Sequence, residues 1–232
     1  QTHIWNGKVC LMTSQHEHPG ASLGDYLAGV ESGLSGLKSR RVISRIWSGD
    51  HTVWKPDPTE ISNRLVRLTV TYAMRDQTPA MQALAQEVRD AGIRHVVLLG
   101  MGGSSLGPEV LRQTFGSAPG YPELIVLDST VPAWVQSVTD AINPAHTLFL
   151  VSSKSGSTTE PNMFYAYFRG LVEKAAGKDG AGQHFIAVTD AGTSLEKLAI
   201  DQGFRRAFAN PPEIGGRYSV LSYFGLVPAT LI

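Results

Sequence analysis

The feature that most constrains the fold of this chain is an alternation of short apolar runs with helix-like segments, which begins near Thr78. The first run is His95–Leu99, a continuous apolar stretch of the kind found in strands that are covered on both faces. Repeated alternation of such strands with helices favours a parallel sheet with helices on both sides. The later runs lie at Leu124–Asp128, Thr147–Val151, His184–Thr189 and Arg206–Ala209.

The segments between these runs carry start and stop signals of helices. Pro79–Ala91 has apolar residues at helical spacing, and Gly92 follows as a C-terminal stop. Pro108–Phe115 opens with a proline, which is favoured in the first helical turn. The sequence therefore predicts, for residues 78–232, a doubly wound α/β domain on a five-stranded parallel sheet in the flavodoxin-like order 2-1-3-4-5. The other expected helices are Pro132–Ala141, Glu160–Lys174 and Ser194–Ile200.

Residues 1–77 lack this regularity, and we interpret them as an irregular, partly helical N-terminal leader. His3–Met12 has strand-like content, and Leu23–Val30 is expected to form a short helix. A turn or two of helix is expected at Thr59–Leu65. Asp50 and His51 form one adjacent pair with no third catalytic partner in sight, which indicates a surface position.

Composition excludes several classes of protein. Lys plus Arg and Asp plus Glu both number 20, so charge gives no argument for binding nucleic acid or an anionic membrane. No run approaches the roughly 20 apolar residues of a membrane helix. The single cysteine, Cys10, excludes an internal disulfide and favours a reducing compartment, which we expect to be the cytoplasm. The seven histidines show no metal-ligand spacing, so we expect neither metal nor cofactor.

The most polar loop of the chain follows the third apolar run. Val151–Glu160 contains six hydroxyl side chains, one glycine and the ammonium of Lys154. The N–H groups at a helix N-terminus form a ready anion site, and short hydroxyls approach it without bulk. The alternative is a loop that merely caps the next helix, but a cap needs only one hydroxyl. We favour a phosphate site.

A glycine-rich loop follows the first apolar run. Gly100–Gly107 has glycine at its first and third positions, as in a dinucleotide-binding loop, and Asp128 stands where a ribose ligand is expected. Ser105 at the sixth position weakens that interpretation, and the loop lacks the Walker signature. Glycines that serve only tight turning are a further alternative. Because ligands bind beyond the carboxyl ends of parallel strands, this loop and the serine loop are expected to share one crevice.

A third motif lies at Glu213–Ser219, where two glycines precede Arg217. The glycines permit close backbone approach, and the guanidinium can be offered to an oxyanion. Taken alone, this pattern is more often a turn with a surface arginine. Glu160, at the start of a helix, is similarly open to two interpretations, as a base or as a complement to the helix dipole, and we prefer the second.

Together the three motifs carry a family resemblance. In order and spacing, Gly100–Pro108, Ser153–Glu160 and Gly215–Ser219 resemble the first sugar-isomerase (SIS) domain of the glucose-6-phosphate isomerase family. Arg45–Asp50 and Ile61–Leu65 are similar to the N-terminal region of that family, so the resemblance covers roughly residues 40–232. The leader also resembles, weakly, the join in bifunctional proteins in which a transaldolase precedes the isomerase.

The resemblance implies a role for each residue of the motifs. Gly103 and Ser104 would touch the sugar, Arg217 would stabilise an enediolate intermediate, and Glu160 would lie nearby as a second catalytic candidate. No metal or cofactor is implied. The residues expected around the sugar phosphate are Ser153, Lys154, Ser155 and Thr158.

The implied reaction is the interconversion of glucose 6-phosphate and fructose 6-phosphate, which needs a base, a ring-opening group and positive charge for the oxyanion. In the family the base glutamate, a histidine and a late lysine lie in segments that would follow Ile232. Since the chain starts without Met and stops inside an apolar segment, we expect a piece of a longer enzyme that is inactive alone. The resemblance implies that the complete enzyme is a homodimer. A non-catalytic phosphosugar-sensing module is the main alternative, and a dinucleotide-dependent reductase is the third.

Overall fold

The computed structural model describes residues 23–232, which divide into two compact units between Ser48 and Gly49. The first unit contains a 3-10 turn, Gly24–Tyr26, and the helices α1 (Leu27–Ser39) and α2 (Val42–Trp47). None of its described residues is buried. The helix expected at Leu23–Val30 thus continues to Ser39. The strand-like segment at 3–12, with Cys10, lies outside the described residues.

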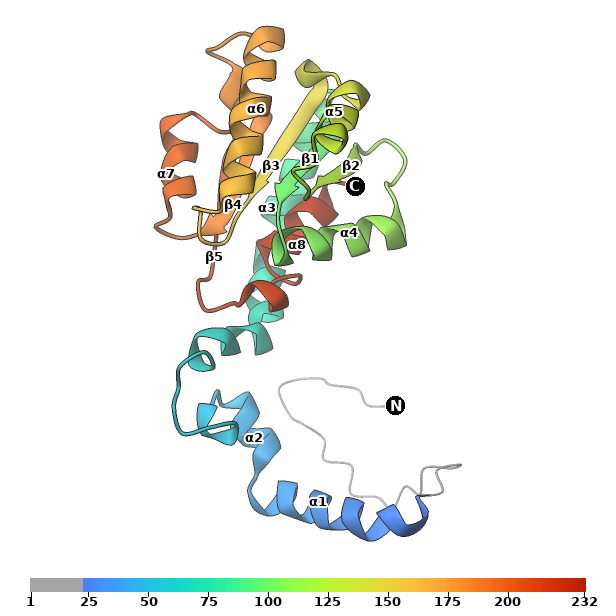
Figure 1. Ribbon diagram of the computed structural model, residues 1–232, viewed down its shortest axis with the longest axis vertical. Coiled ribbons are helices and arrows are strands. Elements are labelled where there is room, and N and C mark those ends of the chain that lie inside the picture. Colours follow the sequence, from blue (N-terminus) through green and yellow to red (C-terminus); the bar gives the residue numbers. More distant parts are fainter. Residues whose placement is uncertain (1–22) are drawn as a thin grey trace. The chain divides into compact units, whose positions relative to one another are not determined.

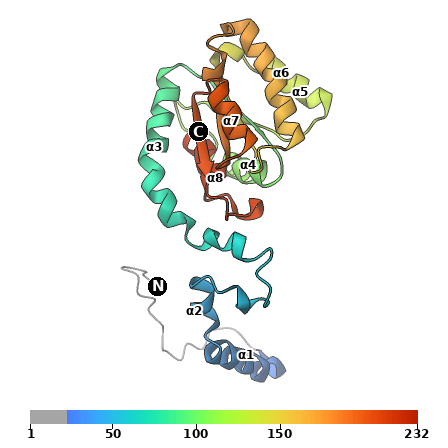
Figure 2. The ribbon, with the colours of Figure 1, turned by 90° about the vertical axis from the view of Figure 1, so that its left-hand side faces the viewer.

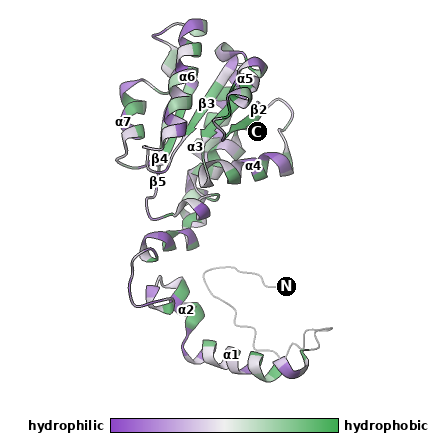
Figure 3. Cartoon of the chain, in the orientation of Figure 1, coloured by the Kyte–Doolittle hydropathy of each residue, from purple (hydrophilic) through white to green (hydrophobic). Residues whose placement is uncertain are grey.

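The second unit is built on five parallel strands in the order β2-β1-β3-β4-β5, as predicted (Figure 1). Each strand matches an apolar run of the sequence to within one or two residues. The strands are mainly hydrophobic in the colours of Figure 3, because helices cover both faces of the sheet. Their bounds are β1 His95–Gly100, β2 Glu123–Leu127, β3 Thr147–Ser152, β4 Phe185–Asp190 and β5 Arg206–Asn210.

Helices cover the two faces of the sheet with separate cores (Figures 1 and 2). On one face, α3 (Val70–Asp90) and α8 (Tyr223–Thr230) pack on the strands, and α4 (Gly103–Phe115) packs against α8. Side chains of α5, α6 and α7 fill the other face around Phe149 and Phe185. These helices are α5 Pro132–Ala141, α6 Thr159–Ala176 and α7 Ser194–Asp201.

The pairing of β1 with β3 positions the polar loops. Gly100 pairs with Ser152 at the carboxyl ends of the two strands. The chain then leaves β1 toward α4 and leaves β3 toward α6, on opposite faces of the sheet. The glycine loop and the serine loop therefore flank one point of the sheet edge, the switch point at which such folds bind ligands.

The expected boundary between leader and domain, at residues 77 and 78, falls inside α3. That helix begins nine residues before Pro79, at Val70, and Pro79 lies in its interior. Val70 and Met74 are buried, so the apolar face of the helix simply extends upstream. The 3-10 segment Ser62–Leu68 precedes it, close to the turn expected at Thr59–Leu65.

Two further helices differ from expectation. The helix expected from Pro108 begins at Gly103, so the glycine loop forms its first turn and Pro108 lies inside it. Helix α8 was not predicted at all. Ser222 stands at its N-cap position, but its sequence is apolar on nearly every side and contains Pro228, so it shows no helical periodicity.

Candidate functional site

A cavity of about 450 Å³ opens at the carboxyl edge of the sheet, and we call it the carboxyl-edge cavity. Its wall is formed by the turn from β1 into α4, the loop after β3 and the last residue of β4, together with the Gly-Gly-Arg segment before α8. All six residues expected to bind substrate line it: Gly103, Ser104, Ser153, Lys154, Ser155 and Thr158. The remaining wall residues are Met101, Ser152 and Gly216, which belong to the three motifs but were given no role, and Asp190, which lies outside the motifs.

The hydroxyls of the serine loop bind one another rather than cap the following helix. The Oγ of Ser153 donates to the Oγ1 of Thr158 at 2.9 Å, and Ser155 lies 3.5 Å from the same oxygen. Thr158 is the N-cap residue of the 18-residue helix α6, yet its side chain makes no cap hydrogen bond to the N–H groups of the first turn. Those N–H groups are therefore available to a ligand, which favours the anion-site interpretation over simple capping.

Gly156 fixes the path of the serine loop. Its φ is +68°, a conformation that favours glycine, and a Cβ at this position would lie 2.7 Å from the Cβ of Thr193. The hydroxyl of Ser194 donates to the Gly156 carbonyl at 3.0 Å. The loop is thus fastened to the start of α7, and only glycine permits the contact.

The glycine loop and the Gly-Gly-Arg segment touch through their backbones. A Cβ on Gly103 would lie 2.1 Å from the carbonyl oxygen of Gly216, so no larger residue fits. The hydroxyl of Ser219 donates to that same carbonyl at 2.6 Å. Two motifs that are more than 100 residues apart in the sequence thereby form one wall of the cavity.

Lys154 pairs with a carboxylate that sequence reasoning missed. Its ammonium donates to the Oδ2 of Asp190 and, at 2.9 Å, to the carbonyl of Pro212. Burial raises the pKa of the Asp190 carboxyl, and the neighbouring ammonium counteracts part of that rise. The available signal was its position, since Asp190 is the polar residue that ends the buried strand β4 at the ligand-binding edge.

The cavity wall also contains polar atoms with no partner among the described residues. These are the Oγ of Ser152 and the Oδ1 of Asp190, and both residues are buried. Buried polar atoms are rarely left without a hydrogen bond, so both are available to a molecule that enters the cavity.

The two candidate catalytic residues lie outside this wall. Arg217 has an exposed side chain on the 3-10 turn Gly216–Tyr218, next to the wall residue Gly216. Glu160 lies in the first turn of α6, where a carboxylate complements the helix dipole. Among the described residues, the titratable side chains of the wall are Lys154 and Asp190, which neutralise each other.

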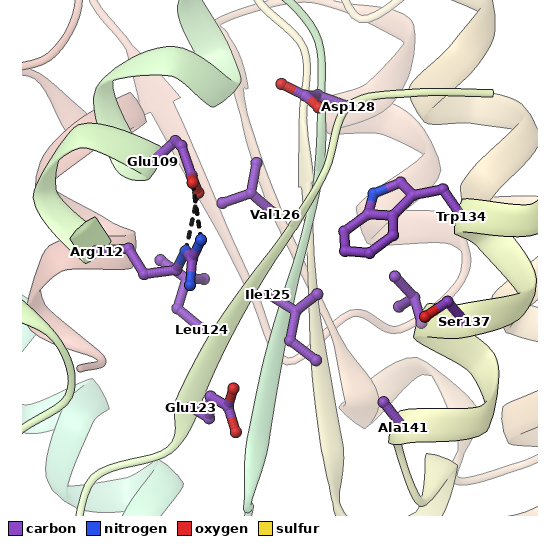
Figure 4. A pocket seen from close by; sticks show the side chains of 11 residues that line it. Glu109, Arg112, Glu123, Leu124, Ile125, Val126, Asp128, Trp134, Ser137 and Ala141 are labelled. Atoms are coloured by element: carbon purple, nitrogen blue, oxygen red, sulfur yellow. Dashed lines mark hydrogen bonds and ion pairs between the residues drawn. The ribbon is translucent and has the colours of Figure 1, made fainter. Parts of the chain in front are cut away.

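A second cavity, of about 420 Å³, lies over the edge strand β2 between α4 and α5, and we call it the edge-strand cavity (Figure 4). Arg112 donates two hydrogen bonds, of 2.8 and 2.7 Å, to Glu109 on one side, and Trp134 faces them from α5. Asp128, the candidate ribose ligand, lines this cavity and not the carboxyl-edge cavity.

Residues 23–232 contain neither a metal-binding cluster nor a membrane-spanning helix. No group of three or more His, Cys, Asp or Glu side chains there is arranged to hold a metal ion. Within the same range, no helix has the length and apolar character needed to cross a membrane.

The sequence is similar to a known protein family and to curated relatives. Residues 68–232 match the profile of the family described as Phosphoglucose isomerase. A glucose-6-phosphate isomerase of Rubrobacter xylanophilus is 33% identical over 217 residues, covering 89% of this chain and 48% of the relative. One from Staphylococcus saprophyticus is 34% identical over 169 residues, covering 70% and 38%. The chain thus spans about half the length, or less, of these curated relatives.

Solved structures show the same fold. A hypothetical protein of Thermus thermophilus superposes with a TM-score of 0.70 at 26% identity, covering 89% of this chain and 47% of that one. A glucose-6-phosphate isomerase of Chlamydia trachomatis superposes with a TM-score of 0.62 at 25% identity, covering 82% and 34%.

Proposed function

The chain belongs to the phosphoglucose isomerase family, and we propose that it supplies the sugar-phosphate site of an enzyme that interconverts glucose 6-phosphate and fructose 6-phosphate. The observation that carries the proposal is the convergence of the serine loop, the glycine loop and the Gly-Gly-Arg segment on one cavity. We also propose that the complete enzyme is a cytoplasmic homodimer, as the family resemblance implies.

The phosphate group would lie against the serine loop. Ser153, Ser155 and Thr158 offer hydroxyls there, and the uncapped N–H groups of α6 add a partial positive charge. A phosphate held at this point supplies binding energy remote from the reacting carbons, which fixes C1 and C2 for proton transfer. The sugar would then extend past Gly103 and Ser104 toward Gly216.

Proton transfer between C2 and C1 passes through an enediolate, whose negative charge needs stabilisation. Arg217 follows the wall residue Gly216 and is the cation we assign to that oxyanion. Glu160 stays a weaker catalytic candidate because its place in the first turn of α6 suits a dipole role. The one carboxylate of the described wall, Asp190, is paired with Lys154, so we propose that the general base comes from outside these 232 residues.

The proposal is tested by isomerase assays on the complete polypeptide and on the 232-residue chain. We expect the complete enzyme to convert fructose 6-phosphate and its Arg217→Ala variant to lose about 10²–10³-fold in kcat, the usual cost of removing an oxyanion partner. The isolated chain should bind fructose 6-phosphate without turnover. Binding without turnover by the complete polypeptide would instead indicate a phosphosugar sensor, and nicotinamide-dependent reduction would indicate a reductase.

A further inference from the structure

The ammonium of Lys154 lies where three loops of the carboxyl edge meet. Lys154 belongs to the loop after β3, its carboxylate partner Asp190 ends β4, and its carbonyl partner Pro212 lies in the loop after β5. Two of the three ammonium N–H groups are therefore used within the protein. Pro212 lies five residues before Arg217, so this contact connects the serine loop to the segment that carries the arginine.

The backbone around the pair is fixed on both sides. The N–H of Asp190 donates to the carbonyl of Lys154 at 3.2 Å, and the N–H of Ser153 donates to the carbonyl of Val188 at 3.0 Å. These bonds extend the pairing of β3 and β4 by one step beyond the strands. Both charged residues are thus anchored, whereas the Pro212 carbonyl lies in a loop that has left the sheet.

The charges explain why the contact persists. Asp190 is 8% exposed, and a buried carboxylate that loses its cation is strongly disfavoured. The pairing therefore keeps the Lys154 ammonium at Asp190, within reach of Pro212. A neutral side chain at 190 would leave the ammonium free to move away from that carbonyl.

We propose that Asp190 is a positioning residue: it holds the Lys154 ammonium on the Pro212 carbonyl and so fixes the loop that presents Arg217 beside the cavity. This inference rests on the proposed function for its catalytic consequence. In this arrangement the serine-loop hydroxyls and the N–H groups of α6 bind the phosphate. The Lys154 ammonium instead binds the Pro212 carbonyl.

Limited trypsin digestion of the 232-residue chain tests the structural part without any isomerase assay. Arg217 is exposed, so cleavage after it, followed by mass spectrometry, reports the mobility of its loop. We expect about 10-fold faster cleavage in Asp190→Asn and in Lys154→Met, and no further increase in the double variant, because each change breaks the same contact. Wild-type cleavage rates in both single variants, or effects that multiply in the double variant, would overturn the proposal.

Matched controls separate this effect from unfolding. Lys197→Met and Asp201→Asn remove exposed charges on α7 and should leave the cleavage rate at Arg217 unchanged. Cleavage after Arg75, within α3, reports general unfolding. The proposal requires the ratio of cleavage at Arg217 to cleavage at Arg75 to rise, and a parallel rise at both sites would contradict it.

Steady-state kinetics of the complete polypeptide test the catalytic part. Both single variants should lower kcat about 10-fold while KM for fructose 6-phosphate stays within about 3-fold, as expected when a transition-state group is displaced. If Lys154→Met raised KM alone and Asp190→Asn lowered it, the ammonium would belong to the phosphate, and the proposal would be wrong. A wild-type polypeptide without isomerase activity would refute the proposed function, and the digestion would still decide the loop contact.

Discussion

The two cavities of the second unit have nearly the same volume and very different walls. The edge-strand cavity is lined by side chains from the middle of β2 and from α4 and α5 (Figure 4). The carboxyl-edge cavity is lined by loops, by glycine backbone, by hydroxyls and by the start of a long helix. Volume alone therefore does not identify the functional site of this molecule.

The charges make the same distinction. In the edge-strand cavity, Arg112 is bound by two hydrogen bonds to Glu109, which lowers the pKa of that carboxyl through the hydrogen bond itself. In the carboxyl-edge cavity, burial dominates and raises the pKa of Asp190. The Glu109 carboxylate is thus stabilised as an anion, whereas burial disfavours the charged form of Asp190. Perturbed pKa values of this kind are common at functional sites.

The largest expected difference between the cavities concerns ligand affinity. The double variant Ser153→Ala/Thr158→Val removes two hydroxyls of the serine loop, each a candidate donor to a charged phosphate. We expect it to weaken fructose 6-phosphate binding about 100-fold, as measured by calorimetry on the 232-residue chain. Ser137→Ala removes a hydroxyl from the edge-strand cavity and should leave the affinity unchanged. Equal losses of affinity in both variants would mean that the ligand does not distinguish the two cavities.

The second prediction concerns the wall shared by the glycine loop and the Gly-Gly-Arg segment. Gly103→Ala forces a Cβ against the Gly216 carbonyl and should destabilise the chain by about 1–3 kcal/mol in denaturant unfolding. Gly170→Ala, in α6, meets open space and should stabilise the chain by about 0.5–1 kcal/mol. If both substitutions had the same sign, the close approach at Gly103 would not be a constraint.

The third prediction concerns the ion pair of the edge-strand cavity. Arg112→Met breaks the ion pair with Glu109. The side chains of Arg112 and Glu109 are both about one-third exposed. Pairs with this exposure contribute little, so we expect a loss of at most about 1 kcal/mol in unfolding free energy. The affinity for fructose 6-phosphate should not change. About a tenfold loss of affinity would indicate that the ligand binds in the edge-strand cavity and would contradict its assignment to the carboxyl-edge cavity.

The smallest effect is a pH dependence of opposite sign in the two cavities. The lowered pKa of Glu109 gives stability above its usual value of 4.5, and that stability is lost as pH falls through the folded pKa. The raised pKa of Asp190 gives stability below 3.8, which is lost as pH rises through the folded pKa. Relative to wild type, Glu109→Gln should therefore lose stability as pH rises, and Asp190→Asn should gain it. Denaturant unfolding between about pH 3 and 7, the range in which carboxyl groups titrate, measures both trends.

Sequence patterns predicted the sheet because each strand is a continuous apolar run with turn residues at its ends. They also predicted that the loops after His95–Leu99 and Thr147–Val151 would meet, since strand order decides which carboxyl ends are neighbours. Helix α8 could not be predicted, because burial on nearly all sides erases the helical period. The start of α3 was missed because Pro79 resembles a helix start.

The contacts between loops were beyond sequence reasoning. Lys154 and Asp190 are 36 residues apart, and nothing in either local pattern indicates that they pair. Gly103 was expected to touch the sugar, yet the constraint on its size comes from Gly216. The first contact depends on the pairing of β3 with β4, and the second depends on where the segment after β5 meets the start of α4. Only the folded sheet decides both.

An amide chemical-shift map of the 232-residue chain, titrated with fructose 6-phosphate, locates the phosphate site directly. We expect the largest shifts on residues 153–160, at the serine loop and the start of α6, with smaller shifts at Gly103 and Ser104. Residues of β2 and α5, around the edge-strand cavity, should not move. Shifts centred on β2 and α5, or no shifts at a saturating concentration of the sugar phosphate, would contradict the assignment of the phosphate to the carboxyl-edge cavity.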